Sequence, residues 1–288
     1  MGLRQVCQLT RWKVSLLAAC STFTGAAAFS AAYALQPAVL VPTAGTLFLA
    51  LGASALNQVQ ERELDARMER TRGRPIPVGA VSLGAASLLG VLCVVGGAAV
   101  LAAGAGWTAA LLGVAAVAWY NGVYTYLKRV TAFAALPGAL VGALPPVIGW
   151  TAAGGNPLDP RALALAVVFL FWQVPHFWLL LLRWGPDYEQ AGLPSLTAVF
   201  GREQLARISL AWLVAAGAVG VLIPLYELGR APWALVYPGA GLALIAVLGA
   251  GLALLETWRF HLLAFRSVNT YLLAMMALLT ADRLLRLA

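Results

Sequence analysis

Charged residues are scarce in this sequence. The 19 Lys+Arg and 11 Asp+Glu residues make up only 10% of the 288 positions, whereas soluble domains carry about 25%. Cysteine is almost absent: Cys7, Cys20 and Cys93 are scattered, which excludes a disulfide framework and a thiolate metal site. There is also no zinc-finger spacing, RNA-binding signature or basic tract interleaved with aromatics, so we expect no nucleic-acid partner. The scarcity of charged residues excludes a soluble globular domain.

Apolar side chains are abundant, at 61% of the residues. They form continuous runs close to the length of about 20 residues that a membrane-spanning helix needs. Transmembrane β-strands would instead alternate in runs of about ten residues. We therefore predict an all-α, polytopic integral membrane protein with nine transmembrane helices. The expected spans are 14–35, 38–57, 82–104, 107–126, 132–152, 162–182, 205–225, 232–254 and 265–287.

The distribution of Lys and Arg predicts how these spans are oriented, because cations are translocated reluctantly and gather on the cytoplasmic side. With a cytoplasmic N-terminus and nine spans, 15 of the 19 Lys+Arg residues lie inside. The four outside are Arg161, Arg230, Arg283 and Arg286. The sequence thus predicts a protein of the cytoplasmic (inner) membrane with its C-terminus outside. Most of the net charge of +8 reflects this orientation.

An acidic ladder, Asn57, Glu61 and Asp65, follows the second expected span. These residues are four positions apart, so on a helix they advance by about 40° each and share one face. Hard oxygen ligands one turn apart suit Mg²⁺, which binds through one or two carboxylates together with phosphate oxygens of a substrate. We expect a magnesium site here. The alternative is a solvated loop laced with salt bridges, which would have the same composition.

Arginines flank the ladder, at positions 67, 70, 72 and 74. Guanidinium groups bind phosphate oxygens in a fork geometry, so this segment is also suited to a diphosphate. A second polar loop, with Asp187, Tyr188 and Glu189, joins the sixth and seventh spans on the same expected side. The two loops could face each other across a central cavity. The alternative is that the second loop is a plain connector.

The first loop resembles the Asn-x-x-x-(Asp/Glu)-x-x-x-Asp motif of the UbiA superfamily of intramembrane prenyltransferases. Its continuation through Met68, Arg70-Thr71 and Arg74-Pro75 narrows the resemblance to the protoheme IX farnesyltransferases, or heme O synthases. Four further blocks resemble the same family in order. They begin at Tyr124, Gly138, Trp172 and Asp187. The matched blocks span residues 57 to 201 and are specific together, because chance does not readily place five motifs in register.

The resemblance implies a UbiA-like fold of nine helices around a central cavity, in a single domain over residues 1–288. It implies farnesyl diphosphate and heme B as substrates, heme O as product and Mg²⁺ as cofactor. Cytoplasmic loops 58–81 and 183–204 would form a cap over the diphosphate. The expected catalytic and metal-binding residues are Asn57, Glu61, Asp65 and Asp187. Besides membrane lipid, the implied partners are heme A synthase or terminal oxidase assembly proteins.

Other residues are candidates for substrate binding. Lys128 and Arg129 end the fourth span, where snorkelling alone would place cations, and their match to the family motif points to phosphate. His176 follows Pro175, which can kink the helix, and imidazole commonly binds heme iron. A hydrogen bond inside the bundle is the alternative for His176. The expected substrate-binding residues are Arg70, Arg74, Tyr124, Lys128, Arg129, Gln173, His176 and Tyr188, with His176 also a candidate heme iron ligand.

Three other functions stay open on the residues alone. A UbiA-type enzyme could prenylate another aromatic acceptor or quinone precursor, because the acidic ladder does not select the acceptor. A transporter of an anionic lipid-linked substrate would share the buried polar residues, but transporters often show an internal repeat and none is evident. A non-catalytic heme-binding assembly factor would need only His176. Magnesium-dependent release of diphosphate distinguishes an enzyme from the last two.

Overall fold

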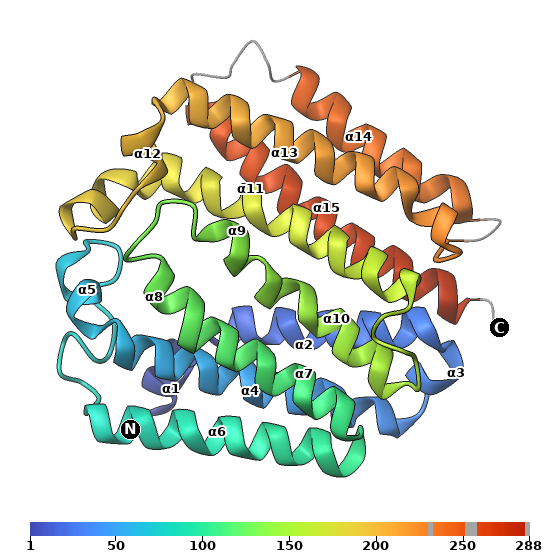
Figure 1. The fold of residues 1–288 in the computed structure, drawn as a ribbon, viewed down its shortest axis with the longest axis horizontal. Helices are drawn as coiled ribbons and strands as arrows, with labels where there is room; N and C mark the ends of the chain where they lie inside the picture. Colours follow the sequence, from blue (N-terminus) through green and yellow to red (C-terminus); the bar gives the residue numbers. More distant parts are fainter. Residues whose placement is uncertain (230–232, 251–257, 286–288) are drawn as a thin grey trace.

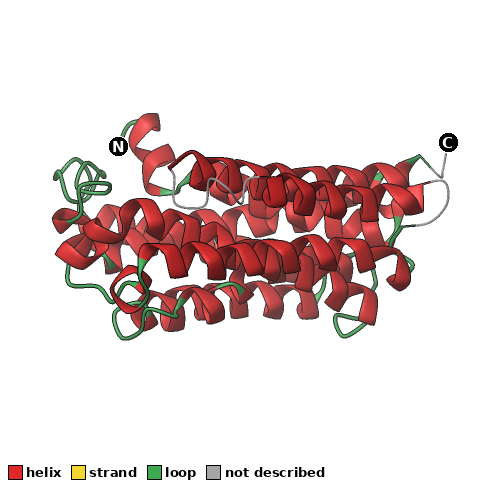
Figure 2. Cartoon of the chain, turned by 90° about the horizontal axis from the view of Figure 1, so that it is seen from above, coloured by secondary structure: helices red, strands yellow, loops and turns green. Residues whose placement is uncertain are grey.

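The computed structural model describes residues 1–229, 233–250 and 258–285, and these ranges contain helices but no strand (Figure 1). The first part of the chain forms α1 (Leu3–Leu9), α2 (Trp12–Phe29), α3 (Ala31–Ala34), α4 (Leu40–Gln60), α5 (Arg62–Arg67), α6 (Leu83–Gly104), α7 (Trp107–Ala118) and α8 (Thr125–Leu127). The second part forms α9 (Ala135–Gly138), α10 (Leu140–Ala152), α11 (Pro160–Gln190), α12 (Leu196–Val199), α13 (Arg202–Leu222), α14 (Val236–Ala250) and α15 (Trp258–Leu284). Figure 2 shows the long helices running alongside one another.

Seven helical stretches in the described residues are long and apolar enough to cross a membrane. This supports a polytopic helical membrane protein, whereas the expected count of nine spans is not confirmed. The expected span 14–35 is interrupted, whereas the expected span 107–126 is helical throughout but changes from α- to π-type. α2 ends at Phe29 because Ser30 is extended and caps α3, and a π-helical segment, Trp119–Tyr124, joins α7 to α8. The ends of spans 232–254 and 265–287 fall partly outside the described residues.

Glycines allow α2 and α10 to approach each other closely. A Cβ atom added at Gly25 on α2 would lie 1.8 Å from the carbonyl oxygen of Pro146 on α10. One added at Gly149 would lie 1.8 Å from the carbonyl oxygen of Thr22. Small residues permit this backbone contact between membrane helices. The close contact of these two helices positions one wall of the cavity described below.

The two loops expected on one side of the membrane lie at the same end of the bundle. Figure 1 shows α1, α5 and α12 at this end, and α15 finishes at the opposite end. The Gln5 side chain on α1 donates a hydrogen bond to the Ala80 carbonyl at 3.2 Å, which ties the N-terminal helix to the first loop. α11 is longer than the expected span 162–182, so Asp187 and Tyr188 are part of a helix that runs to Gln190.

Candidate active site

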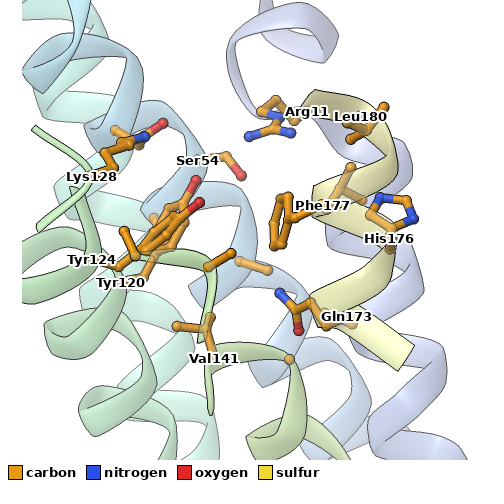
Figure 3. Close-up of a pocket in the computed structure, with 18 of the residues that line it drawn as sticks. Arg11, Ser54, Tyr120, Tyr124, Lys128, Val141, Gln173, His176, Phe177 and Leu180 are labelled. Carbon is orange, nitrogen blue, oxygen red and sulfur yellow. The ribbon is translucent and has the colours of Figure 1, made fainter. Parts of the chain in front are cut away.

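A cavity of about 350 Å³ lies among α2, α4, α10 and α11, with further walls from α5, α7 and α15. Apolar residues such as Leu49, Ala53 and Phe169 line its body. Polar residues line it where α4 runs into α5 and the first loop. Figure 3 shows two facing walls, with Lys128 and Tyr124 on one and α11 on the other.

The structure brings the acidic ladder together on the cavity wall. Asn57, Glu61 and Asp65 all line the cavity, and their exposed fractions are only 1%, 8% and 3%. The helix is interrupted at Glu61, but the backbone keeps the helical pattern across the interruption. The Glu61 N–H donates to the Asn57 carbonyl at 2.9 Å, and the Asp65 N–H donates to the Glu61 carbonyl at 2.8 Å. This continuity holds the three side chains on one face.

Each carboxylate of the ladder is paired with a cation. The Arg74 Nη1 atom donates to both oxygens of Asp65, at 2.8 and 2.7 Å, and Lys128 forms an ion pair with Glu61. Burial raises the pKa of the Asp65 carboxyl above its ordinary value, because desolvation outweighs the attraction of the Arg74 charge. The Arg74 contact opposes this rise, because a neighbouring cation favours the ionised carboxylate.

Asn57 is fixed from the π-helical side of the cavity. Its amide nitrogen donates to the Thr125 hydroxyl at 2.9 Å, and that hydroxyl donates to the Tyr120 carbonyl at 2.9 Å. Next to it, the Asn121 amide donates to Gln60 Oε1 at 2.9 Å. Short π-helical segments frequently occur at functional sites. Here the segment and Thr125, which directly follows it, supply the polar partners that orient the end of α4.

Asp187 is placed differently from the ladder. Its two oxygens accept the backbone N–H groups of Glu69 at 2.6 Å and Arg70 at 3.1 Å, and it is not part of the cavity lining. Among the residues that the structure describes, no three His, Cys, Asp or Glu side chains gather closely enough to hold a metal ion. Asp187 therefore links the two loops, and it does not gather with Asn57, Glu61 and Asp65 into the expected four-residue metal site.

The expected substrate-binding residues divide into two groups. Arg129 lies away from the cavity, where its guanidinium donates to the Gln60 carbonyl at 2.8 Å and stacks on Tyr126. The other seven line the cavity. They are Arg70, Arg74, Tyr124, Lys128, Gln173, His176 and Tyr188. Arg70 also donates to the Tyr188 hydroxyl at 3.1 Å, so these two residues connect the first loop to α11.

His176 has a partner that sequence reasoning missed. Its Nδ1 atom lies 2.8 Å from the Asn269 side-chain oxygen, and the Asn269 amide nitrogen donates to the Phe265 carbonyl at 2.6 Å. The Asn269 amide nitrogen is thus the donor to Phe265, and the Asn269 side-chain oxygen can only accept. The His176 Nδ1 atom must therefore carry the hydrogen of this bond. The Nε2 atom then keeps a lone pair that can bind a metal or accept a proton. The one signal in the sequence was an amide side chain within the last apolar span.

Comparison with known proteins gives the family. Residues 18–280 match the UbiA prenyltransferase family. The chain is 50% identical over 201 residues to a protein named protoheme IX farnesyltransferase from Geobacter sulfurreducens, covering 69% of this chain and 74% of that one. It is 39% identical over 283 residues to a protein of the same name from Nitratidesulfovibrio vulgaris (strain DP4), covering 97% and 95% of the two chains.

Solved structures show the same fold. A UbiA homologue from Archaeoglobus fulgidus, solved bound to GPP and Mg²⁺, superposes with a TM-score of 0.64 at 16% identity. The superposition covers 95% of this chain and 99% of that one. The chain therefore belongs to the UbiA prenyltransferase family, in the branch of the protoheme IX farnesyltransferases.

Proposed function

We propose that this chain transfers the farnesyl group of farnesyl diphosphate to a vinyl group of heme B and adds water, which gives heme O and diphosphate. The name shared by its relatives supports this activity. The structural observation that carries it is the content of one cavity, which holds the ion pairs of Asp65 and Glu61 together with the imidazole of His176. The ion-paired carboxylates and their cations suit a metal-bound diphosphate, and the imidazole suits a heme.

The residues of the acidic ladder fit a magnesium ion. Asn57, Glu61 and Asp65 offer one amide oxygen and two carboxylates within the cavity, and Mg²⁺ prefers such oxygen ligands. Asn57 uses its nitrogen toward Thr125, so its oxygen remains available. We propose that these three residues hold Mg²⁺, which when bound would supply positive charge to the leaving diphosphate. The contacts of Asp187 favour a role in closing the cap over a role as fourth ligand.

The reaction develops charge at two places, on the leaving diphosphate and on the farnesyl cation. The allylic C–O bond of farnesyl diphosphate breaks and its electron pair leaves with the diphosphate. The vinyl π electrons form the new C–C bond, and water then adds to the resulting cation and loses a proton. Arg70, Arg74 and Lys128 are placed to stabilise the diphosphate as its charge grows. The apolar body of the cavity keeps bulk water from the farnesyl cation.

The heme would occupy the α11 side of the cavity. The Nε2 lone pair of His176 is suited to an axial contact with iron, and Gln173 and Tyr124 line the surrounding walls. Loops 58–81 and 183–204 would form the cap over the diphosphate. We propose that residues 1–288 form a single domain. Its downstream partners would be proteins that use heme O, such as heme A synthase or terminal oxidase assembly proteins.

We also propose that all nine expected segments cross the cytoplasmic (inner) membrane, with the N-terminus inside and the C-terminus outside. Residues 107–127 form helix of α- and π-type without a break, and a helix of this length would extend about 30 Å, the thickness of the hydrocarbon core. The segment 14–35 contains α2, which packs against α10 inside the bundle. Both segments therefore have the surroundings of spanning helices.

The decisive experiment is incubation of the purified protein with heme B, farnesyl diphosphate and Mg²⁺, followed by mass analysis of the porphyrin and measurement of released diphosphate. We expect heme O and one diphosphate per heme O. Adding 4-hydroxybenzoate in competition tests the acceptor, because another aromatic acceptor would use the same diphosphate site. Prenylated 4-hydroxybenzoate without modified heme would refute the proposed acceptor. Heme binding without any diphosphate release would point to a non-catalytic factor.

A further inference from the structure

Arg11 is a cation of the cavity wall to which the sequence assigned no role in the site. Four cations line the cavity, and three of them have protein partners. Arg74 and Lys128 contact carboxylates, and Arg70 contacts a tyrosine hydroxyl. Within the described part of the chain, the half-buried Arg11 guanidinium has no hydrogen-bond or ion-pair partner. A charged group that loses water without gaining a partner is costly, so this position suits an anionic ligand.

The backbone at Arg11 is held in an uncommon conformation. Its φ of 47° and ψ of 46° are left-handed, a region that residues with a Cβ atom seldom adopt. Gln58 of α4 holds the preceding turn by donating to the carbonyls of Gln8 at 2.9 Å and Leu9 at 2.8 Å. Such strain persists when the surroundings impose it, and it is concentrated at functional sites. The junction between α1 and α2 thus holds Arg11 at a set place beside the ladder.

Arg11 reaches the cavity between the two walls that Figure 3 shows. Figure 3 shows its side chain projecting from the α1–α2 junction into the space between Ser54 and the α11 residues Phe177 and Leu180. Lys128, which pairs with Glu61, lies on the other side of the view. Arg11 forms no ion pair with the ladder, and its side chain faces the α11 wall, along which a heme would lie.

We infer that Arg11 binds a carboxylate of the acceptor, namely a propionate of heme B, and this inference rests on the proposed function. The two propionates lie on one edge of the heme. Their charge keeps that edge at the polar end of the cavity while the ring enters the apolar body. The fork of a guanidinium matches a carboxylate with two parallel hydrogen bonds. Arg11 would orient the heme by its carboxylate edge while His176 contacts the ring.

The test uses Arg11→Asn in the full-length protein. Asparagine tolerates the left-handed backbone, so the variant should keep its fold, and Arg4→Asn on the exposed part of α1 is the matched control. Titration of the Soret band should show that heme B binds Arg11→Asn about 10- to 100-fold more weakly, the loss typical for a hydrogen bond to a charged group. The KM for farnesyl diphosphate should change less than twofold. Arg11→Lys should recover part of the loss.

Iron protoporphyrin dimethyl ester provides the second arm, because it lacks the propionate charges. We expect the wild-type protein and Arg11→Asn to bind the ester equally. An equal loss of affinity for heme B and its ester, or a raised KM for farnesyl diphosphate with unchanged heme binding, would overturn the inference. Turnover is measured separately from binding. A protein that binds heme B through Arg11 but makes no heme O would refute the proposed function and leave this inference intact.

Discussion

The Arg74 guanidinium contacts both carboxylate oxygens of Asp65, at 2.7 and 2.8 Å, although the two residues are nine positions apart. The loop after α5 turns back to make this contact, and the Thr71 hydroxyl reinforces the turn by donating to the Asp65 carbonyl at 3.1 Å. Asp65 is 3% exposed, and the Arg74 cation favours its ionised form. The pair joins a proposed metal ligand and a proposed phosphate-binding group in one unit.

Replacing Asp65 with Asn removes one charge and keeps the size of the side chain. We expect kcat to fall by at least about 10²-fold, as when a major electrostatic stabiliser of a transition state is lost. Heme binding should stay within twofold of wild type. Glu63→Gln is the control, because the Glu63 side chain is 74% exposed and outside the cavity. Near-normal turnover of Asp65→Asn would exclude it as a metal ligand.

Replacing Asp187 with Asn should loosen the cap. Asp187 accepts two backbone N–H groups of the first loop, and losing a charge-assisted hydrogen bond should raise the KM for farnesyl diphosphate about tenfold. Trypsin should also cleave the arginine-rich segment 67–74 faster. The Mg²⁺ concentration required for half-maximal rate should stay unchanged. If that concentration rises as much as in Asp65→Asn, Asp187 is a metal ligand after all.

The pairing of His176 with Asn269 makes a spectroscopic prediction. His176→Ala should shift the Soret band of bound heme, because the nitrogen proposed to contact the iron is lost. Asn269→Leu removes the acceptor for Nδ1–H and should shift the band less, by freeing the tautomer and orientation of the ring. Absorption spectra of the heme-loaded proteins measure both effects. Identical spectra and heme affinity in all three proteins would mean that His176 only packs in the bundle.

Gly149→Ala should destabilise the fold. The new methyl group would meet the Thr22 carbonyl oxygen at 1.8 Å, and overpacking of this kind typically costs about 1–3 kcal/mol. Gly96→Ala on α6 is the control, because an added Cβ there meets nothing within 4 Å. That change should be neutral or stabilising by up to about 1 kcal/mol. In thermal unfolding in detergent, the Tm of Gly149→Ala should be lower than that of the wild type. The Tm of Gly96→Ala should be equal to it or higher.

Topology can be tested with single cysteines at Ala80 and Gln190, after removal of Cys7, Cys20 and Cys93. Both positions are exposed at the loop end of the bundle, so they should react in broken cells. In intact cells an impermeant thiol reagent should label neither, because the proposed orientation places both loops in the cytoplasm. Ready labelling of either cysteine in intact cells would reverse the proposed orientation.

The class of the protein and its local chemistry can be read from the amino-acid sequence alone. Long apolar runs require helices in a membrane, because only helices satisfy their own backbone hydrogen bonds there. The spacing of Asn57, Glu61 and Asp65 is a property of a single helical segment, so the shared face was readable without the rest of the fold. The family motifs were readable for the same reason, since each is a short contiguous stretch.

Which side chains contact one another depends on the tertiary structure. The partners of His176 and Asp187 are 93 and about 118 residues away, and such contacts depend on how whole helices pack and rotate. The positions of Arg129 outside the cavity and Arg11 within it also follow from packing, because both read in sequence as ordinary cations at span ends. The break at Ser30 and the change to π-helix over Trp119–Tyr124 are features of the local backbone, which an apolar run of about 20 residues does not reveal.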